Sequence, residues 1–226
     1  MSFQRLFREE CHGLNQFLRR REEKQTPPKK NITRVATLET KTKETRIKVH
    51  VNIDGDGTSH VHTATKFLDH MIAGFSSHSL IDIDISAKGD LKHHIIEDTA
   101  LALGRCLSKA LGERNGLTRF GFAFVPMDES LAFASVDLVK RRYFVLEGLE
   151  LKRDYIEDLA KEDVEHFFHS LCDALDCTMH IRLEYGKNDH HKIESCFKAL
   201  ALALRRAAEV DSRRRKNVAP SSKGRM

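Results

Sequence analysis

The sequence contains one pattern of histidine and glutamate residues twice, and this duplication predicts a fold of two similar halves. His70 precedes the segment HHIIE at 93–97, and His166 precedes the segment HHKIE at 190–194 at nearly the same distance. A single His-His-x-x-Glu motif is typical of a helix surface or cap. Two copies, each with an upstream histidine, indicate instead an internal repeat that carries one chemical function twice.

The similarity extends into the residues that follow each motif. A shift of 97 positions places Ala102 on Ala199 and Leu103 on Leu200. Apolar residues recur with the helical period in both segments, which predicts two matching long helices over 93–112 and 190–210.

Shorter periodic segments surround these helices. Alternating apolar and polar residues predict strands, and helical spacing predicts two further helices over 66–80 and 164–175. The sequence DGDG at 54–57 predicts a hairpin turn between the first two strands. The predicted strands span 46–53, 59–65, 81–89, 120–128, 130–139, 143–148 and 177–186.

Each half is therefore predicted as β-β-α-β-α, which gives an α+β fold. The halves are related by a pseudo-two-fold, and their sheets pack with helices. The predicted boundaries are an N-terminal appendage and linker over 1–32, a first half over 33–117, a second half over 118–211, and a C-terminal tail over 212–226.

The net charge of +5 is concentrated near the two ends of the chain, at 19–21, 29–30 and 213–216. Such charge runs are typical of solvated tails. Nucleic-acid binding is the alternative, but it is disfavoured because the runs lack interleaved aromatic residues or a known motif.

The cysteines and apolar segments predict a cytoplasmic protein without a membrane partner. The five cysteines are odd in number and form no CxxC pair, which favours reduced thiols. No apolar run approaches the roughly 20 residues that cross a bilayer. The first residues also lack the apolar stretch of a secretory signal.

Imidazole and carboxylate are the ligands that many divalent metal ions take in proteins. His93 and Glu97 are four residues apart on a helix, so they can bind one ion, whereas His94 points about 100° away, toward another. The same holds in the second repeat. Two ions would thus share eight ligands, four each, with two positions of each ion open. The predicted ligands are His70, His93, His94, Glu97, His166, His190, His191 and Glu194.

Several basic or hydroxyl residues could bind an anionic substrate beside these ions. Lys198 lies one turn beyond Glu194 on the same helix face. The segment SSKG at 221–224 supplies hydroxyls, an ammonium group and a glycine, as a phosphate clamp requires. For each of these residues alone, a solvated surface position is the simpler interpretation.

Six motifs in order resemble the imidazoleglycerol-phosphate dehydratase family of histidine biosynthesis, over about residues 33–224. One departure is KRRY at 140–143, where the family has Gly-Arg-Pro-Tyr, although Arg141 keeps its position. The motifs are FLDHM (67–71), AKGDLKHHIIED (87–98), RFG (119–121), PMDE (126–129), HHKIESCFKALALALR (190–205) and SSKG (221–224).

This resemblance implies a lyase that dehydrates D-erythro-imidazole glycerol phosphate to imidazole acetol phosphate. It implies two Mn²⁺ ions per active site, bound by the eight residues above, that bind the substrate imidazole. It also implies a large octahedral homo-oligomer with sites built between subunits. The implied catalytic residues are Glu44, Glu97 and Glu194, and the implied substrate-binding residues are Glu44, His70, Arg119, Arg141, Lys198, Ser222 and Lys223.

Two other classes of function remain open from the residues. A dinuclear metallohydrolase acting on a phosphoester would use two ions about 3.5–4 Å apart. A nucleic-acid-binding or scaffold protein would depend on the basic ends, so deletion of 1–30 and 212–216 would abolish that function and leave a dehydratase active.

Overall fold

The computed structural model describes residues 34–214 and 218–221. The predicted appendage, Ser222 and Lys223 lie outside the described residues. In the described part of the chain, no helix is long and apolar enough to cross a membrane.

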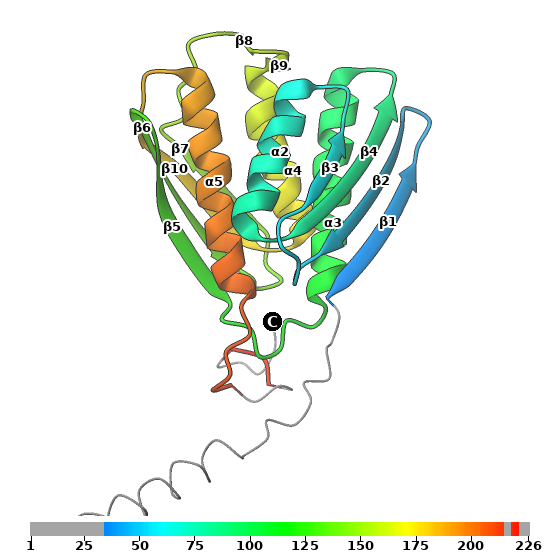
Figure 1. The fold of residues 1–226 in the computed structure, drawn as a ribbon, viewed down its shortest axis with the longest axis vertical. Helices are drawn as coiled ribbons and strands as arrows, with labels where there is room; N and C mark the ends of the chain where they lie inside the picture. Colours follow the sequence, from blue (N-terminus) through cyan, green and yellow to red (C-terminus); the bar gives the residue numbers. More distant parts are fainter. Residues whose placement is uncertain (1–33, 215–217, 222–226) are drawn as a thin grey trace, which may run out of the picture. The chain divides into compact units, whose positions relative to one another are not determined.

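The first half forms a four-stranded sheet with the strand order β1-β2-β4-β3 (Figure 1). The outer pair β3 and β4 is parallel, and the other pairs are antiparallel. Its elements are β1 (Val35–Lys41), β2 (Thr45–Asn52), β3 (Ser59–His62), α2 (Lys66–Ser79), β4 (Asp82–Gly89) and α3 (Lys92–Leu111).

The second half repeats this topology as a sheet with the order β5-β6-β10-β7, in which β7 and β10 form the parallel pair. A two-stranded sheet of β8 and β9 is inserted before α4. Its elements are β5 (Phe120–Met127), β6 (Ser130–Asp137), β7 (Tyr143–Glu147), β8 (Tyr155–Ile156), β9 (Leu159–Ala160), α4 (Lys161–Leu175), β10 (Thr178–Tyr185) and α5 (Asp189–Ala208).

Within the described residues, helices α2, α3, α4 and α5 lie between the two four-stranded sheets (Figure 1). α3 packs on the first sheet, α5 packs on the second, and the halves meet where α2 packs on α5 and α3 on α4. Alternating apolar and polar residues in the strands explain this arrangement. Ile47, Val49 and Val51 of β2 point inward and are fully buried, while the residues between them face outward. The predicted α+β class, with sheets packed against helices, is confirmed.

Two details of the predicted strands were wrong. The first half contains one more strand than β-β-α-β-α, because β1 was not predicted; its only buried residue is Ala36, which leaves little apolar alternation to detect. The second half contains β5, β6 and β7, which were predicted, and the short strands β8 and β9, which were not. The DGDG segment does not form a hairpin, since β3 pairs with β4 and not with β2. The carboxylate of Asp82 accepts backbone N–H bonds from Asp56, Gly57 and Thr58, and this folds the loop around the end of β4.

Arg114 links the two halves from a buried position. Its guanidinium donates to the backbone oxygens of Leu138, Leu175 and Asp176 at 2.5–3.2 Å, and to the Ser108 hydroxyl at 2.9 Å. Burial lowers the pKa of this guanidinium. These bonds fix the C-terminal end of α4. His166 lies nearer the N-terminal end of the same helix.

We expect Arg114→Met to lower the free energy of unfolding by about 2–4 kcal/mol, because it leaves buried carbonyl oxygens without donors. The measurement is the urea midpoint at fixed protein and metal concentrations. Arg105→Met, at an exposed position of α3, is the control. Equal midpoints for the two variants would show that Arg114 is not a structural link.

Candidate metal centre

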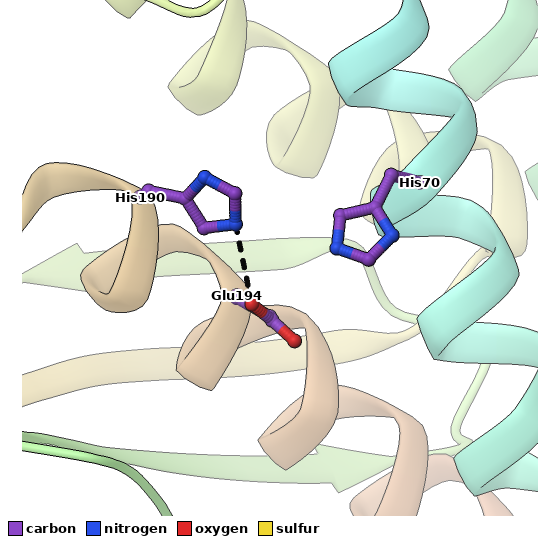
Figure 2. Close-up of side chains that lie close together, drawn as sticks. All are labelled: His70, His190 and Glu194. Atoms are coloured by element: carbon purple, nitrogen blue, oxygen red, sulfur yellow. Dashed lines mark ion pairs between the residues drawn. The ribbon is translucent and has the colours of Figure 1, made fainter.

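The N-terminal turns of α2 and α5 bring together His70, His190 and Glu194, here called the α2–α5 group. One donor atom from each residue lies within 4.8 Å of the others. His190 Nε2 lies 3.4 Å from Glu194 Oε2. Figure 2 shows both imidazole rings directed toward the space beside the carboxylate. The group therefore joins the lone histidine of the first half to the repeated motif of the second.

The mirror combination forms between α3 and α4. His93, Glu97 and His166, here called the α3–α4 group, also hold donor atoms within 4.8 Å of one another. His166 Nε2 lies 3.3 Å from Glu97 Oε1, and the His93 and His166 ring centroids are 5.0 Å apart. Here the lone histidine belongs to the second half and the motif to the first.

Both groups fit a divalent metal ion. Ligands about 2.1 Å from an octahedral ion are about 3 Å apart when adjacent and about 4.2 Å apart when opposite, so donors gathered within 4.8 Å need only small adjustments. His166 Nε2 is buried and makes no hydrogen bond, although Glu97 lies near it. A buried ring nitrogen without a hydrogen-bond partner needs another partner. A metal ion bound between His166 Nε2 and the Glu97 carboxylate would be that partner.

Carboxylates contact the Nδ1 atoms of three of the predicted ligands. Asp163 accepts from His93 at 2.6 Å, and Asp90 accepts from His94 at 2.8 Å. Glu129 accepts from His191 at 2.8 Å. Because a carboxylate accepts the Nδ1 proton, Nε2 is left as the nitrogen for a metal ion.

His94 and His191 lie outside both groups. Each follows a group member on its helix and therefore points in another direction. The hydrogen bond that His94 donates to Asp90 raises the pKa of His94, and Glu44 Oε2 lies 3.9 Å from the same nitrogen. Within one chain, Glu44 thus lies near His94 and is a member of neither group.

Lys198 lies beside the α2–α5 group. Its ammonium is 2.8 Å from Glu194 Oε1 and 3.3 Å from the sulfur of Met127. Burial acts to raise the pKa of Glu194, but the Lys198 hydrogen bond and charge lower it overall. A substrate anion that reached this side of Glu194 would meet a positioned cation.

Arg119 lies near the opposite end of α5. Its backbone N–H donates to the Ala207 oxygen, 17 residues beyond His190. Since a helix rises 1.5 Å per residue, this point is about 25 Å from His190 along the axis. The guanidinium forms a two-pronged ion pair with Asp137, at 2.6 and 2.9 Å, and donates to the Pro220 oxygen at 2.8 Å. Arg119 thus lies beside the C-terminal segment that leads to Ser222.

Arg141 lies in the exposed turn between β6 and β7. The structure therefore brings six of the predicted metal ligands into two groups. The other predicted site residues in the described part of the chain belong to neither group: His94, His191, Glu44, Lys198, Arg119 and Arg141.

Three carboxylates that support predicted ligands were not predicted from the sequence. One is Asp163, although it lies one turn before His166 and so shares its helix face. The others are Glu129 and Asp90, which accept hydrogen bonds from His191 and His94.

The model of the family described as imidazoleglycerol-phosphate dehydratase matches residues 63–204, more than half of the chain. The chain belongs to this family. The family predicted from the sequence motifs is thereby confirmed, and its name is that of a hydro-lyase.

Family relatives differ in length. The chain is 46% identical over 194 residues to the histidine biosynthesis bifunctional protein HisB of Stenotrophomonas maltophilia, with 84% of the chain and 52% of the relative covered. It thus spans about half the length of that relative. The imidazoleglycerol-phosphate dehydratase of Chloroherpeton thalassium is 44% identical over 182 residues, covering 79% of the chain and 93% of the relative.

A solved structure of the family shares the fold. The crystal structure of IGPD from Pyrococcus furiosus is 34% identical and superimposes with a TM-score of 0.72, over 84% of the chain and 100% of that structure.

Proposed function

We propose that the chain is the dehydratase of histidine biosynthesis that converts D-erythro-imidazole glycerol phosphate to imidazole acetol phosphate. The observation that carries the proposal is the pair of groups, each with two histidines and one glutamate, in a chain of this family. We further propose two Mn²⁺ ions per active site and a cytoplasmic location.

The α2–α5 group and the α3–α4 group would each hold one ion. When bound, the ions would supply Lewis acidity and a template for the substrate imidazole. The hydroxyl that leaves is on the carbon attached to the ring, and the proton that leaves comes from the C–H of the next carbon, which is not acidic. Loss of water across these two carbons gives an enol, and addition of a proton to the ring-adjacent carbon converts it to the ketone of imidazole acetol phosphate.

Glu44 is our candidate for the group that moves a proton. Its carboxylate is exposed and lies beside His94, a predicted ligand, without belonging to either group. A carboxylate near the metal but not bound to it can take and return a proton during turnover.

The active site would be built between subunits of a homo-oligomer, for which we propose the large octahedral assembly of the family. Two features support this. Each group supplies three donors, while His94 and His191 point elsewhere with their Nδ1 atoms already bound to carboxylates. In addition, Arg119 lies about 25 Å from His190 along α5, and a molecule of one ring, three carbons and a phosphate cannot span that distance.

The alternative function is a dinuclear metallohydrolase acting on a phosphoester. It would hold its ions about 3.5–4 Å apart, usually with a ligand shared between them. Among the described residues, none belongs to both groups. Family membership also favours the dehydratase.

The test is direct: the purified protein is incubated with imidazole glycerol phosphate and Mn²⁺, and formation of imidazole acetol phosphate is followed. We expect turnover that stops after chelation and returns when Mn²⁺ is restored. Hydrolysis of a phosphoester substrate, with no dehydration, would favour the alternative.

We expect Lys198→Ala to raise the KM at least tenfold without removing the metal. A charged hydrogen bond to phosphate contributes about 1.5–3 kcal/mol, equivalent to a change of about 10- to 150-fold. Steady-state kinetics and elemental analysis measure the two quantities. If the metal content falls as well, Lys198 has a structural function; if neither changes, the phosphate binds elsewhere.

A further inference from the structure

The two groups are built from the same repeat, but their surroundings have diverged at the position three residues before each lone histidine. Asp163 precedes His166, and Phe67 precedes His70. Asp163 is nearly buried, with 7% of its side chain exposed, and accepts from His93 Nδ1 at 2.6 Å. Phe67 packs edge-on against the His190 ring, with the centroids 4.9 Å apart.

A second difference lies one turn beyond each glutamate. The shift of 97 positions pairs Lys198 with Leu101. Glu194 therefore shares its carboxylate with an ammonium group at 2.8 Å, whereas Glu97 has only an apolar residue at the matching position. A cation on a ligand carboxylate weakens its attraction for a metal ion, by competing for its lone pairs and by repulsion.

Other carboxylates do not cancel these differences. Glu157 Oε1 lies 3.6 Å from His190 Nδ1, which is longer than a hydrogen bond. The Glu157 side chain is 57% exposed, so solvent screens its charge. His94 and His191 each have one carboxylate on Nδ1 at 2.8 Å, and so they do not distinguish the groups.

We infer that the two metal sites are unequal, and that the α3–α4 group binds a divalent ion at least tenfold more tightly than the α2–α5 group. The inference rests on the proposed function, in which both groups hold an ion. Carboxylates that orient a ligand histidine typically change metal affinity by about 10- to 100-fold. Asp163 would be the positioning residue of the tight site, and Lys198 would weaken the other.

The experiment is a graded removal of metal from the intact, Mn²⁺-loaded protein. Samples are equilibrated with increasing concentrations of a chelator, and the Mn²⁺ retained per chain is counted by elemental analysis. We expect a plateau at one ion per chain. Anomalous diffraction from crystals equilibrated at the plateau should place that ion between His93, Glu97 and His166.

Two variants should abolish the plateau, one by weakening the tight site and the other by strengthening the weak site. Asp163→Asn keeps an oxygen acceptor for His93 but removes the charge, so the tight ion should leave at least tenfold more easily. Lys198→Met keeps the length of the side chain but removes the cation, so the weak ion should be retained to higher chelator concentrations. If Asp163→Asn does not fold, Lys198→Met and the wild-type plateau still decide the question.

The outcomes separate the inference from the proposed function. A single release of both ions, or a plateau with the ion in the α2–α5 group, would overturn the inference and leave the dehydratase proposal standing. A protein that binds no Mn²⁺ before chelation would overturn both. A plateau that persists unchanged in both variants would show that Asp163 and Lys198 do not set the difference.

Discussion

His94→Ala and His191→Ala are each expected to lose metal and activity together, although both groups of three ligands stay intact in the altered chain. This is the expected result if each ion takes its fourth protein ligand from a neighbouring subunit. Removing a ligand leaves three protein donors, so we expect Mn²⁺ retention to fall at least tenfold and turnover to reach background. Elemental analysis after gel filtration and the dehydration assay measure the two effects.

The assembly should weaken with the metal, because the missing ligand would also be a link between subunits. Sizing of each variant, with and without Mn²⁺, checks this. His169→Ala is the control: His169 lies on α4 beyond His166, is largely exposed and pairs only weakly with Asp173 at 3.9 Å. It should keep metal, size and turnover. A His191→Ala protein with full metal and activity would contradict the shared site.

A mixing experiment tests the sharing itself. One chain carries His94→Ala with His191→Ala, and the other carries His93→Ala with His190→Ala. Each is expected to be inactive alone. When the two are mixed without metal and assembled with Mn²⁺, intact groups of one chain can meet intact His94 and His191 of the other. Recovered turnover supports sites between subunits, and complete absence of recovery in a well-formed mixed assembly argues for sites within one chain.

Glu44→Gln should retain metal and assembly but lose most turnover. The substitution keeps the size and polarity of the side chain while removing its ability to take a proton. Loss of a general acid or base typically lowers kcat by about 10²- to 10⁴-fold. Equilibrium titration with substrate should show near-normal affinity, since Glu44 is not a ligand of either group.

Glu39→Gln provides the matched control, because Glu39 lies on β1 shortly before Glu44 and pairs with Arg46 at the surface. It should behave as the unmodified protein does. Wild-type turnover of Glu44→Gln would assign the proton transfer to another group, and Asp128 and Glu129 beside His191 would be the next candidates.

Much of the fold followed from the sequence because its strongest signals are periodic. The repeat separated by 97 positions predicted two matching helices, and the structure contains both. The spacing of His93 and Glu97 predicted that they share a helix face, and they lie in one group. β1 escaped prediction because a strand on the sheet edge with one buried residue has little apolar pattern.

The positions of the predicted substrate-binding residues could not be derived from the sequence for a different reason. Their placement depends on how the helices cross and on which end of α5 these residues contact. Neither of these tertiary features produces a repeating pattern in the sequence. Arg119 is held at the far end of α5 by Ala207 and Asp137. Asp163 reaches His93 across 70 residues of sequence, a contact that exists only after α4 packs on α3.

The central claim is that the duplicated motif holds two separate divalent metal ions. Anomalous diffraction from crystals of the Mn²⁺-loaded protein with a bound substrate analogue tests it most directly. We predict two peaks per chain, one between His70, His190 and Glu194 and one between His93, Glu97 and His166, each about 2.0–2.3 Å from its donor atoms. Peaks only 3.5–4 Å apart would instead indicate a dinuclear hydrolase centre, and the absence of peaks at both groups would contradict the account.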